Sequence, residues 1–303
     1  MSAVTLQSFA HGRGHALELA DALGATFGEI GVHEFPDGES RVTVAAPAPT
    51  TILYSPLDRP NEKLVELALA VEALRRGGAA RLVLVAPYLC YMRQDKVFHA
   101  GEAISQKAIG GWIGSLFDRI VTVDAHLHRV TDIRDVFPGR DAQNLTAAEA
   151  IAGFAREQGF SASALIAGPD AESIQWVSHI AGSLGAEAIA GEKTRLGDRD
   201  VRIAFPDARI KGRAVLVADD IVSSGGTVTV AVESLKRAGA ADIVVAVTHA
   251  LFDAEVEARI RAAGARAIWS STSVPHPTNA ISLASLLAGA LHDEIEIENE
   301  KQK

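Results

Sequence analysis

The sequence has 303 residues, enough for two domains with large cores, and its apolar fraction of 48% excludes a disordered chain. The net charge of −9 argues against a general nucleic-acid surface, and the single cysteine, Cys90, excludes an intrachain disulfide and a multi-cysteine metal site. The first residues lack a signal-peptide pattern, and no apolar run reaches about 18 residues. We therefore expect a cytoplasmic protein with neither membrane nor nucleic acid as a partner.

Apolar runs that suit buried strands alternate with segments of helical spacing along the chain. The predicted strands are residues 51–54, 82–85, 120–123, 164–167, 214–217 and 243–247, and the predicted helices are residues 15–23, 62–75, 106–116, 147–157, 173–184 and 229–237. Because strand–helix–strand crossovers are right-handed, this alternation predicts an α/β protein with mainly parallel sheets covered by helices. Residues 280–291 continue as an apolar helix, and the charged ending is expected to fray.

The most informative segment is the run VLVADDIVSSGGT at residues 215–227. A buried strand ends in two carboxylates, and a turn of small residues then leads into a helix: Asp219 and Asp220, followed by Ser223, Ser224, Gly225, Gly226 and Thr227. Glycines let the backbone approach an anion, and the free N–H groups at a helix start favour negative charge. Carboxylates at this edge of a parallel sheet suit ribose hydroxyls or a bound Mg²⁺. The alternative is an ordinary Gly-rich strand-to-helix turn.

Four further residues are candidates for charge stabilisation or metal binding. Lys193 and Arg195 precede a charged stretch without a core pattern, which predicts an exposed, mobile loop able to close over a polyphosphate. A solvated run of charges is the alternative. His126 and Asp170 each follow a predicted strand and are candidate metal positions, with an exposed histidine and a surface turn as the alternatives.

A second group of candidates lies nearer the N-terminus. Phe35, Asp37 and Glu39 occupy a turn-like segment before a strand, where a ring could stack on adenine and carboxylates could accept from its amino group. P-D-G is by itself a common turn, which is the alternative here. Arg93, followed by Gln94, offers a planar fork for a phosphate or a base.

Together these segments resemble the ribose-phosphate pyrophosphokinases, also called phosphoribosyl pyrophosphate synthetases. The matching segments follow the order of that family from residue 33 to about residue 252: HEFPDGESRV, residues 55–67, PYLCYMRQDKVFHAGEAIS, TVDAHLH, GPD, EKTR, the run 215–227 and THALF. Phosphoribosyltransferases share the sugar-phosphate loop but lack the nucleotide and K-x-R segments in this arrangement. Ser223 stands where the family often has a third carboxylate, and archaeal-type members resemble this chain more closely there.

The resemblance implies two phosphoribosyltransferase-like domains, each a mainly parallel sheet flanked by helices. We expect them over residues 1–143 and 144–303, with the last helix free to pack back on the N-terminal domain. The implied reaction transfers pyrophosphate from ATP to the 1-hydroxyl of ribose 5-phosphate with Mg²⁺. The family also implies a homo-oligomer, either a dimer or a multiple of dimers, because its Phe-Asp-Glu segment reaches the nucleotide of a neighbouring subunit.

The resemblance also assigns a role to each candidate residue. Lys193 and Arg195 would be catalytic, and His126 and Asp170 would hold the metal. ATP would be contacted by Phe35, Asp37, Glu39, Arg93 and Gln94, and ribose 5-phosphate by Asp219, Asp220, Ser223, Ser224, Gly225, Gly226 and Thr227. The family often has Gly-Gly after Asp170 and the next residue, where this chain has Glu172 and Ser173. The alternatives are a phosphoribosyltransferase and a non-catalytic regulatory homologue of the synthetase.

Overall fold

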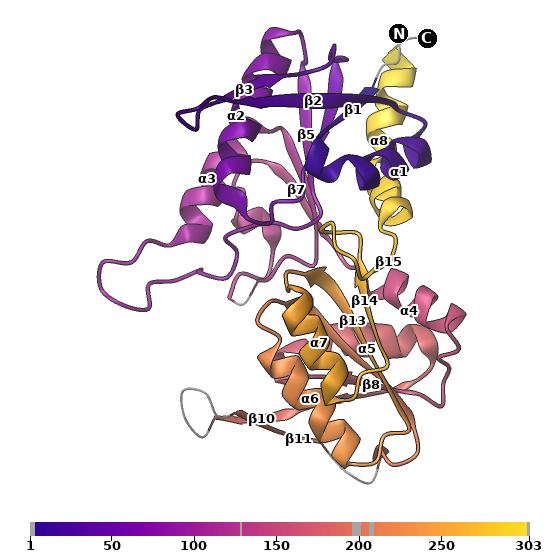
Figure 1. Ribbon diagram of the computed structural model, residues 1–303. Helices are drawn as coiled ribbons and strands as arrows, with labels where there is room; N and C mark the ends of the chain where they lie inside the picture. Colours follow the sequence, from indigo (N-terminus) through magenta and orange to yellow (C-terminus); the bar gives the residue numbers. More distant parts are fainter. Residues whose placement is uncertain (1–3, 128, 196–200, 206–208, 302–303) are drawn as a thin grey trace. The chain divides into compact units, whose positions relative to one another are not determined.

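The computed structural model describes residues 4–127, 129–195, 201–205 and 209–301. The chain forms two compact units, and the colours of Figure 1 follow the chain through them from the N-terminus (indigo) to the C-terminus (yellow). Unit 1 comprises Met1–Leu145, Ser273–Pro275 and Leu283–Lys303, and unit 2 comprises Thr146–Thr272 and His276–Ser282. No helix of the described residues is both long enough and apolar enough to span a bilayer.

Unit 1 is built on a seven-stranded sheet in the order β3-β2-β1-β4-β5-β6-β7. Its strands are β1 (Val4–Phe9), β2 (Thr26–Glu34), β3 (Ser40–Thr43), β4 (Thr50–Tyr54), β5 (Arg81–Ala86), β6 (Arg119–Val123) and β7 (Asp141–Leu145). All neighbouring strands pair in parallel except β2 and β3, which form an antiparallel hairpin. The central strands are buried on both faces because helices cover both sides of a parallel sheet.

Four helices cover the sheet of unit 1: α1 (Arg13–Leu23), α2 (Pro60–Arg76), α3 (Ser105–Leu116) and α8 (Ala284–Lys301). Helices α2 and α3 lie on one face, and α1 and α8 lie together on the other (Figure 1). The apolar stripe of α2, with Leu67 and Leu74 fully buried, packs with Ile113 of α3 against the strands. This core holds the carboxyl ends of β5 and β6. The candidates Arg93 and Gln94 follow β5, and His126 follows β6.

The last helix is fixed to unit 1 by a buried ion cluster. Glu294 of α8 is 2% exposed and receives hydrogen bonds from Arg81 at 2.7 Å and from Arg119 at 2.9 Å. These arginines open β5 and β6, and Arg119 also donates to the Ala290 carbonyl at 2.9 Å. The expectation that the charged ending frays is wrong for residues 292–295, where Glu294 is buried; α8 runs on to Lys301, and residues 302 and 303 lie outside the described part of the chain.

Unit 2 is built on a six-stranded sheet, in the order β15-β14-β13-β12-β8-β9, in which every pairing is parallel. Its strands are β8 (Leu165–Gly168), β9 (Glu187–Ala190), β12 (Ala214–Val222), β13 (Asp242–Ala250), β14 (Ala267–Ser271) and β15 (Asn279–Ile281). Helices α6 (Gly226–Arg237) and α7 (Ala254–Ala263) bury Val232 and Ile260 against one face. Helices α4 (Ala148–Glu157) and α5 (Ile174–Leu184) pack together on the other.

An antiparallel ribbon of β10 (Glu192–Arg195) and β11 (Val201–Ala204) follows β9. Its register places Lys193 opposite Ile203. The sequence predicts a mobile loop here, and for residues 192–195 that prediction is wrong because cross-strand pairing makes them a strand. The five residues between the two strands, 196–200, lie outside the described part of the chain.

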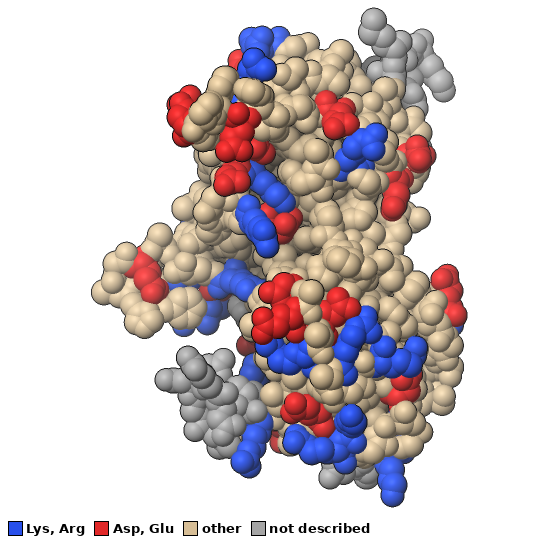
Figure 2. Space-filling model, viewed as in Figure 1, with Lys and Arg blue, Asp and Glu red and all other residues tan. Residues whose placement is uncertain are grey.

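The alternation of strands and helices expected from the sequence is confirmed in both units. All six predicted strands and all six predicted helices are present, with ends shifted by a few residues. The largest shift is in β12, which continues to Val222 because it stays paired with β13. Figure 2 shows basic and acidic side chains intermingled on one face of unit 2. This face therefore carries no broad basic field for nucleic acid.

Candidate functional site

The loop predicted to bind a sugar phosphate lies at the carboxyl edge of the unit 2 sheet. β8 pairs with β12 only as far as Val217, so Asp219 and Asp220 extend past the end of that neighbouring strand. The loop from Ser223 then enters α6, whose first helical residue is Gly226. The two carboxylates and the start of a helix therefore flank one loop, as the sequence predicts, although both acids lie within β12 rather than after it.

Gly225 is the residue that allows this loop to turn into α6. It has φ 71° and caps the helix in the left-handed conformation, and its carbonyl accepts a hydrogen bond from the Thr229 hydroxyl at 2.8 Å. A Cβ at this position would lie 2.4 Å from Val256 Cγ1 of α7. The position therefore requires glycine both for its backbone conformation and for its space.

Gly225→Ala is expected to destabilise the protein by about 1–3 kcal/mol, because strain and overpacking act together. The matched control is Gly226→Ala, since a Cβ there meets nothing closer than 4.0 Å. Denaturant unfolding of both variants measures the difference. Equal stability of the two variants would contradict this account of the loop.

The carboxylates at the carboxyl edge of the unit 2 sheet repel one another. Asp220 is 5% exposed, and its backbone N–H donates to Asp219 Oδ1 at 3.1 Å. Burial raises the pKa of Asp219 well above its ordinary value, and the charges of Asp220 and Asp170 raise it further. A cation placed here would relieve that repulsion.

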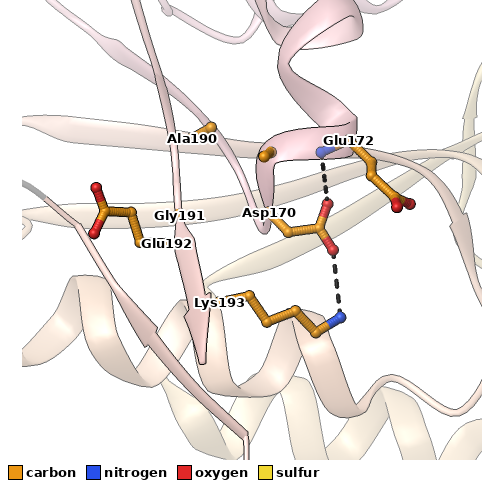
Figure 3. Close-up of a pocket in the computed structure, with 7 residues that line it drawn as sticks. Asp170, Glu172, Ala190, Gly191, Glu192 and Lys193 are labelled. Atoms are coloured by element: carbon orange, nitrogen blue, oxygen red, sulfur yellow. Dashed lines mark hydrogen bonds and ion pairs between the residues drawn. The ribbon is translucent and has the colours of Figure 1, made fainter. Parts of the chain in front are cut away.

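Lys193 joins three segments that are far apart in the sequence. Its ammonium lies 3.3 Å from Asp170 Oδ2 and 3.3 Å from the Thr227 hydroxyl. Figure 3 shows Lys193 reaching toward Asp170, while the neighbouring Glu192 turns its carboxylate away. The structure therefore brings together a predicted catalytic residue, a predicted metal ligand and a predicted sugar-phosphate residue. The backbone of Arg195 lies in β10, and its side chain falls outside what the structure describes.

Asp170 is held in place by the turn that follows β8. Its Oδ1 accepts from the Glu172 N–H at 3.1 Å, and its carbonyl accepts from the buried Ser173 hydroxyl at 2.6 Å. This reciprocal capping leaves Oδ2 directed at Lys193. Glu172 and Lys193 also line a cavity of about 390 Å³ that opens beside Asp170.

The segment Phe35–Glu39 is the turn of the β2–β3 hairpin in unit 1. The Phe35 N–H donates to the Glu39 carbonyl at 2.8 Å, and the Glu39 N–H donates to Asp37 Oδ1 at 3.2 Å. Phe35 is 38% exposed and meets His33 edge-on, with ring centroids 4.9 Å apart. An exposed aromatic ring and two carboxylates on a fixed turn are available to a ligand, while the P-D-G turn predicted from the sequence is also present.

The other unit 1 candidates follow β5 and β6. Arg93 is exposed, whereas Gln94 is half-buried and accepts from the Ser105 hydroxyl at 2.7 Å. His126 is half-buried and comes two residues after Asp124, a buried residue with φ 39°. Such left-handed conformations of non-glycine residues gather at functional sites. His128, two residues further along, lies outside the described residues.

The described residues contain no group of three or more His, Cys, Asp and Glu side chains arranged to hold a metal ion. Within the described residues, a divalent ion at the carboxyl edge of the unit 2 sheet would therefore take only one or two protein ligands. Sequence reasoning missed Arg259 of α7, whose guanidinium donates to the Ser224 carbonyl and braces the loop. Its helical position looks like an ordinary solvent-facing one, so no sequence signal marked it.

Comparison with known proteins identifies the family. Residues 5–115 match the model for the N-terminal domain of ribose phosphate pyrophosphokinase, and residues 142–263 match the phosphoribosyl transferase domain. The chain is 35% identical over 268 residues to the ribose-phosphate pyrophosphokinase of Thermococcus kodakarensis, across 88% of this chain and 92% of that protein. The chain belongs to the ribose-phosphate pyrophosphokinase family.

Further relatives of this pyrophosphokinase extend the match over nearly the whole chain. The ribose-phosphate pyrophosphokinase of Methanopyrus kandleri is 30% identical over 277 residues, across 91% of this chain and 94% of that protein. The crystal structure of phosphoribosylpyrophosphate synthetase from Mycobacterium smegmatis superposes with a TM-score of 0.83 at 26% identity, covering 97% of this chain and 99% of that one. Both relatives compared by sequence are archaeal, in keeping with the archaeal-type loop expected at Ser223.

Proposed function

We propose that this chain is a ribose-phosphate pyrophosphokinase that converts ATP and ribose 5-phosphate into 5-phosphoribosyl 1-pyrophosphate and AMP. The single observation that carries the proposal within the site is the contact of Lys193 with both Asp170 and Thr227. It joins the K-x-R segment, the segment after β8 and the sugar-phosphate loop in one place. The family match over both units supports the same activity.

The proposed reaction is an in-line displacement at the β-phosphorus of ATP. The 1-hydroxyl oxygen of the sugar forms the new bond to that phosphorus, and the bond from the phosphorus to the α,β-bridging oxygen breaks. AMP leaves with the bridging oxygen, and the hydroxyl proton passes to solvent. Because positioning and charge stabilisation dominate phosphoryl-type transfer, the site needs no covalent nucleophile.

The sugar would be held at the carboxyl edge of the unit 2 sheet. Backbone N–H groups and hydroxyls of the loop at residues 223–227 would bind the 5-phosphate, aided by the start of α6. Asp219 and Asp220 would accept hydrogen bonds from the ribose hydroxyls. The capped, left-handed Gly225 supports this role because it fixes the loop before any ligand arrives.

Lys193 would neutralise charge on the transferred pyrophosphoryl group. Its ammonium is 23% exposed and rests on one carboxylate and one hydroxyl, so it can exchange these contacts for phosphate oxygens. Arg195 is proposed as its partner through the family resemblance. The antiparallel pairing of β10 with β11 gives both residues a defined backbone.

The residues of unit 2 fit a requirement for Mg²⁺. Asp170 and Asp219 offer hard oxygen donors, and the pKa of Asp219 is raised first by burial and then by the charges of Asp220 and Asp170, which a bound cation would offset. Mg²⁺ keeps several waters and takes substrate phosphates, so one or two protein ligands suffice. When bound, the ion would neutralise the polyphosphate. Asp170 and His126 are the protein ligands that the family resemblance implies.

Unit 1 is proposed as the nucleotide side. The exposed ring of Phe35 and the Asp37 and Glu39 carboxylates would recognise adenine, and Arg93 would contact the nucleotide beside Gln94. The family resemblance implies that this hairpin contacts the nucleotide bound by a neighbouring subunit. A homo-oligomer is therefore part of the proposal. The cytoplasmic location expected from the sequence stays a prediction.

A phosphoribosyltransferase is the second candidate, because residues 142–263 match that domain. A product assay with ATP, Mg²⁺ and ribose 5-phosphate, without any nucleobase, separates the two. AMP formed one-to-one with 5-phosphoribosyl 1-pyrophosphate is the expected result. ADP would indicate ordinary kinase chemistry and overturn the proposed reaction. Binding of both substrates without any product would indicate a non-catalytic regulatory homologue.

A further inference from the structure

The segment between β5 and α3 holds Arg93 between two anchored neighbours (Figure 1). Met92 is buried, with 2% exposure, and its carbonyl accepts from the Gln106 amide at 3.4 Å. On the other side, Gln94 is bound to the first turn of α3. Arg93 itself is exposed. The backbone that carries this arginine is therefore fixed while its side chain faces solvent.

Gln94 acts as a cap for α3 from outside the helix. The residue before α3, Ile104, has no side chain that can cap, so the first N–H groups need other acceptors. The backbone carbonyl of Gln94 accepts a hydrogen bond from the backbone N–H of Gln106 at 3.2 Å. The side-chain oxygen of Gln94, Oε1, accepts one from the Ser105 hydroxyl at 2.7 Å. The oxygen of the Gln94 side chain is thus committed to α3.

Glu102 closes the loop that separates Gln94 from α3. Its Oε2 accepts from the N–H groups of Phe98 at 2.9 Å and His99 at 3.0 Å, and its Oε1 lies 2.8 Å from His99 Nδ1. Hydrogen bonds from His99 and Phe98 lower the pKa of Glu102. Glu102 therefore fixes the loop between Gln94 and α3, while Gln94 fixes the start of α3.

A second anchor holds the loop at Asp95. Its carboxylate is 1% exposed and pairs with Arg129 at 2.6 Å, and it also accepts from the Arg129 N–H at 3.2 Å. The Arg129 guanidinium lies 5.9 Å from the centre of the Phe98 ring. The loop is thus braced on both sides of the residue pair Arg93–Gln94.

We propose that Ser105, through its hydrogen bond to Gln94, and Glu102, through the loop that it closes between Gln94 and α3, are positioning residues that set the backbone of Arg93 for the nucleotide. We call the hydrogen bonds of Ser105 to Gln94 and of Glu102 to Phe98 and His99 the clasp, because they hold the loop on helix α3. On this account Arg93 makes the contact with ATP. The inference rests on the proposed function, because it assigns the ligand of Arg93 as ATP. Neither Ser105 nor Glu102 belongs to the residues expected to touch ATP, which makes them clean probes.

The test uses Ser105→Ala and Glu102→Gln in the full-length protein. Ser105→Ala removes the hydroxyl that donates to Gln94, and Glu102→Gln weakens the hydrogen bonds that close the loop, so each is expected to raise the KM for ATP about 3- to 10-fold. The KM for ribose 5-phosphate and kcat are expected to stay within about twofold, since the sugar loop and Lys193 are untouched. Ser105→Thr keeps the hydroxyl and is expected to restore the KM for ATP.

The matched control is Ser115→Ala, which removes a serine hydroxyl from the other end of α3 where it donates to the Trp112 carbonyl at 2.6 Å. It is expected to leave the KM for ATP unchanged. Unchanged ATP parameters in both clasp variants, or an equal rise in Ser115→Ala, would overturn the proposal.

Calorimetric titration of ATP with Mg²⁺, without sugar, keeps the proposal distinct from the reaction itself. Weaker ATP binding in the clasp variants supports the positioning role even if no 5-phosphoribosyl 1-pyrophosphate forms, in which case only the proposed reaction fails. Wild-type ATP affinity in both variants overturns the positioning role even if the reaction is confirmed.

Discussion

Lys193→Ala should lower kcat by about 100-fold or more, the usual effect of losing one group that stabilises transition-state charge. Ribose 5-phosphate affinity should change by less than about threefold, because the loop at residues 223–227 keeps its own backbone contacts. The loss should therefore be in kcat and not in the KM for the sugar. Steady-state assays of AMP release, with calorimetric binding of ribose 5-phosphate, measure both quantities.

The control for this variant is Lys211→Ala, which removes an exposed lysine from a turn of the same unit before β12. It should retain full activity, which separates the loss of a particular ammonium from a change in overall charge. The resting contact of Lys193 with Asp170 and Thr227 gives a further expectation. Lys193→Arg keeps the charge but not its compact shape, so it should recover part of the activity. A wild-type kcat for Lys193→Ala would remove this residue from the catalytic site.

Glu294→Ala should destabilise unit 1 by about 3 kcal/mol, the lower end of the usual cost of removing one partner from a buried ion pair, because Arg119 keeps Asp141 at 3.3 Å and Arg81 is 37% exposed. Arg119 has a side chain only 9% exposed, and it would keep its charge after losing the carboxylate that receives it at 2.9 Å. Arg81 would lose both of its 2.7 Å hydrogen bonds to the same group. Denaturant unfolding, followed by far-UV circular dichroism, measures the change.

The neighbouring Asp293→Ala serves as the matched control, because Asp293 is exposed on the same helix. It should change stability by less than about 0.5 kcal/mol. An equal effect of the two substitutions would show that helix propensity, and not the ion cluster, determines the stability of α8.

The effect of Glu294→Ala should also depend on pH. Burial alone would raise the pKa of Glu294, but hydrogen bonds from Arg81 and Arg119 outweigh burial and hold its pKa below the ordinary value. A carboxyl with a lowered folded-state pKa stabilises the fold above its unfolded pKa and loses that contribution as the pH falls. The difference between wild type and variant should therefore be full at neutral pH and shrink below about pH 4.

The sequence predicted the central strands because their signal is local. The run from Val215 to Val217 is apolar on both faces, as a covered parallel strand requires, and the following glycines mark the turn into α6. The carboxyl end of this strand was harder to predict, because aspartates are poor strand formers. Asp219 nevertheless stays in β12 because it pairs with Val247 of β13, a contact about 30 residues away that no local pattern encodes.

Two other regions were mispredicted for the same physical reason. Lys193 and Arg195 look like loop residues, and only pairing with residues 201–204 makes them a strand. Glu294 lies in a stretch that reads as a solvated charge run, yet its partners Arg81 and Arg119 come from much earlier in the chain. The contact of Lys193 with Asp170 also depends on tertiary structure. The residue types of the site could be predicted from motifs, but their partners could not.

The return of α8 to unit 1 has a consequence for how the protein is made. Unit 1 begins at the N-terminus, but its last helix is synthesised only after all of unit 2. During translation Arg81 and Arg119 of the N-terminal sheet therefore have no hydrogen bonds to Glu294 until α8 has been made. Unit 2 has its whole sequence available earlier and can fold first, although it is encoded second. A released chain truncated before residue 284 would carry the whole of unit 2 behind a unit 1 that lacks α8.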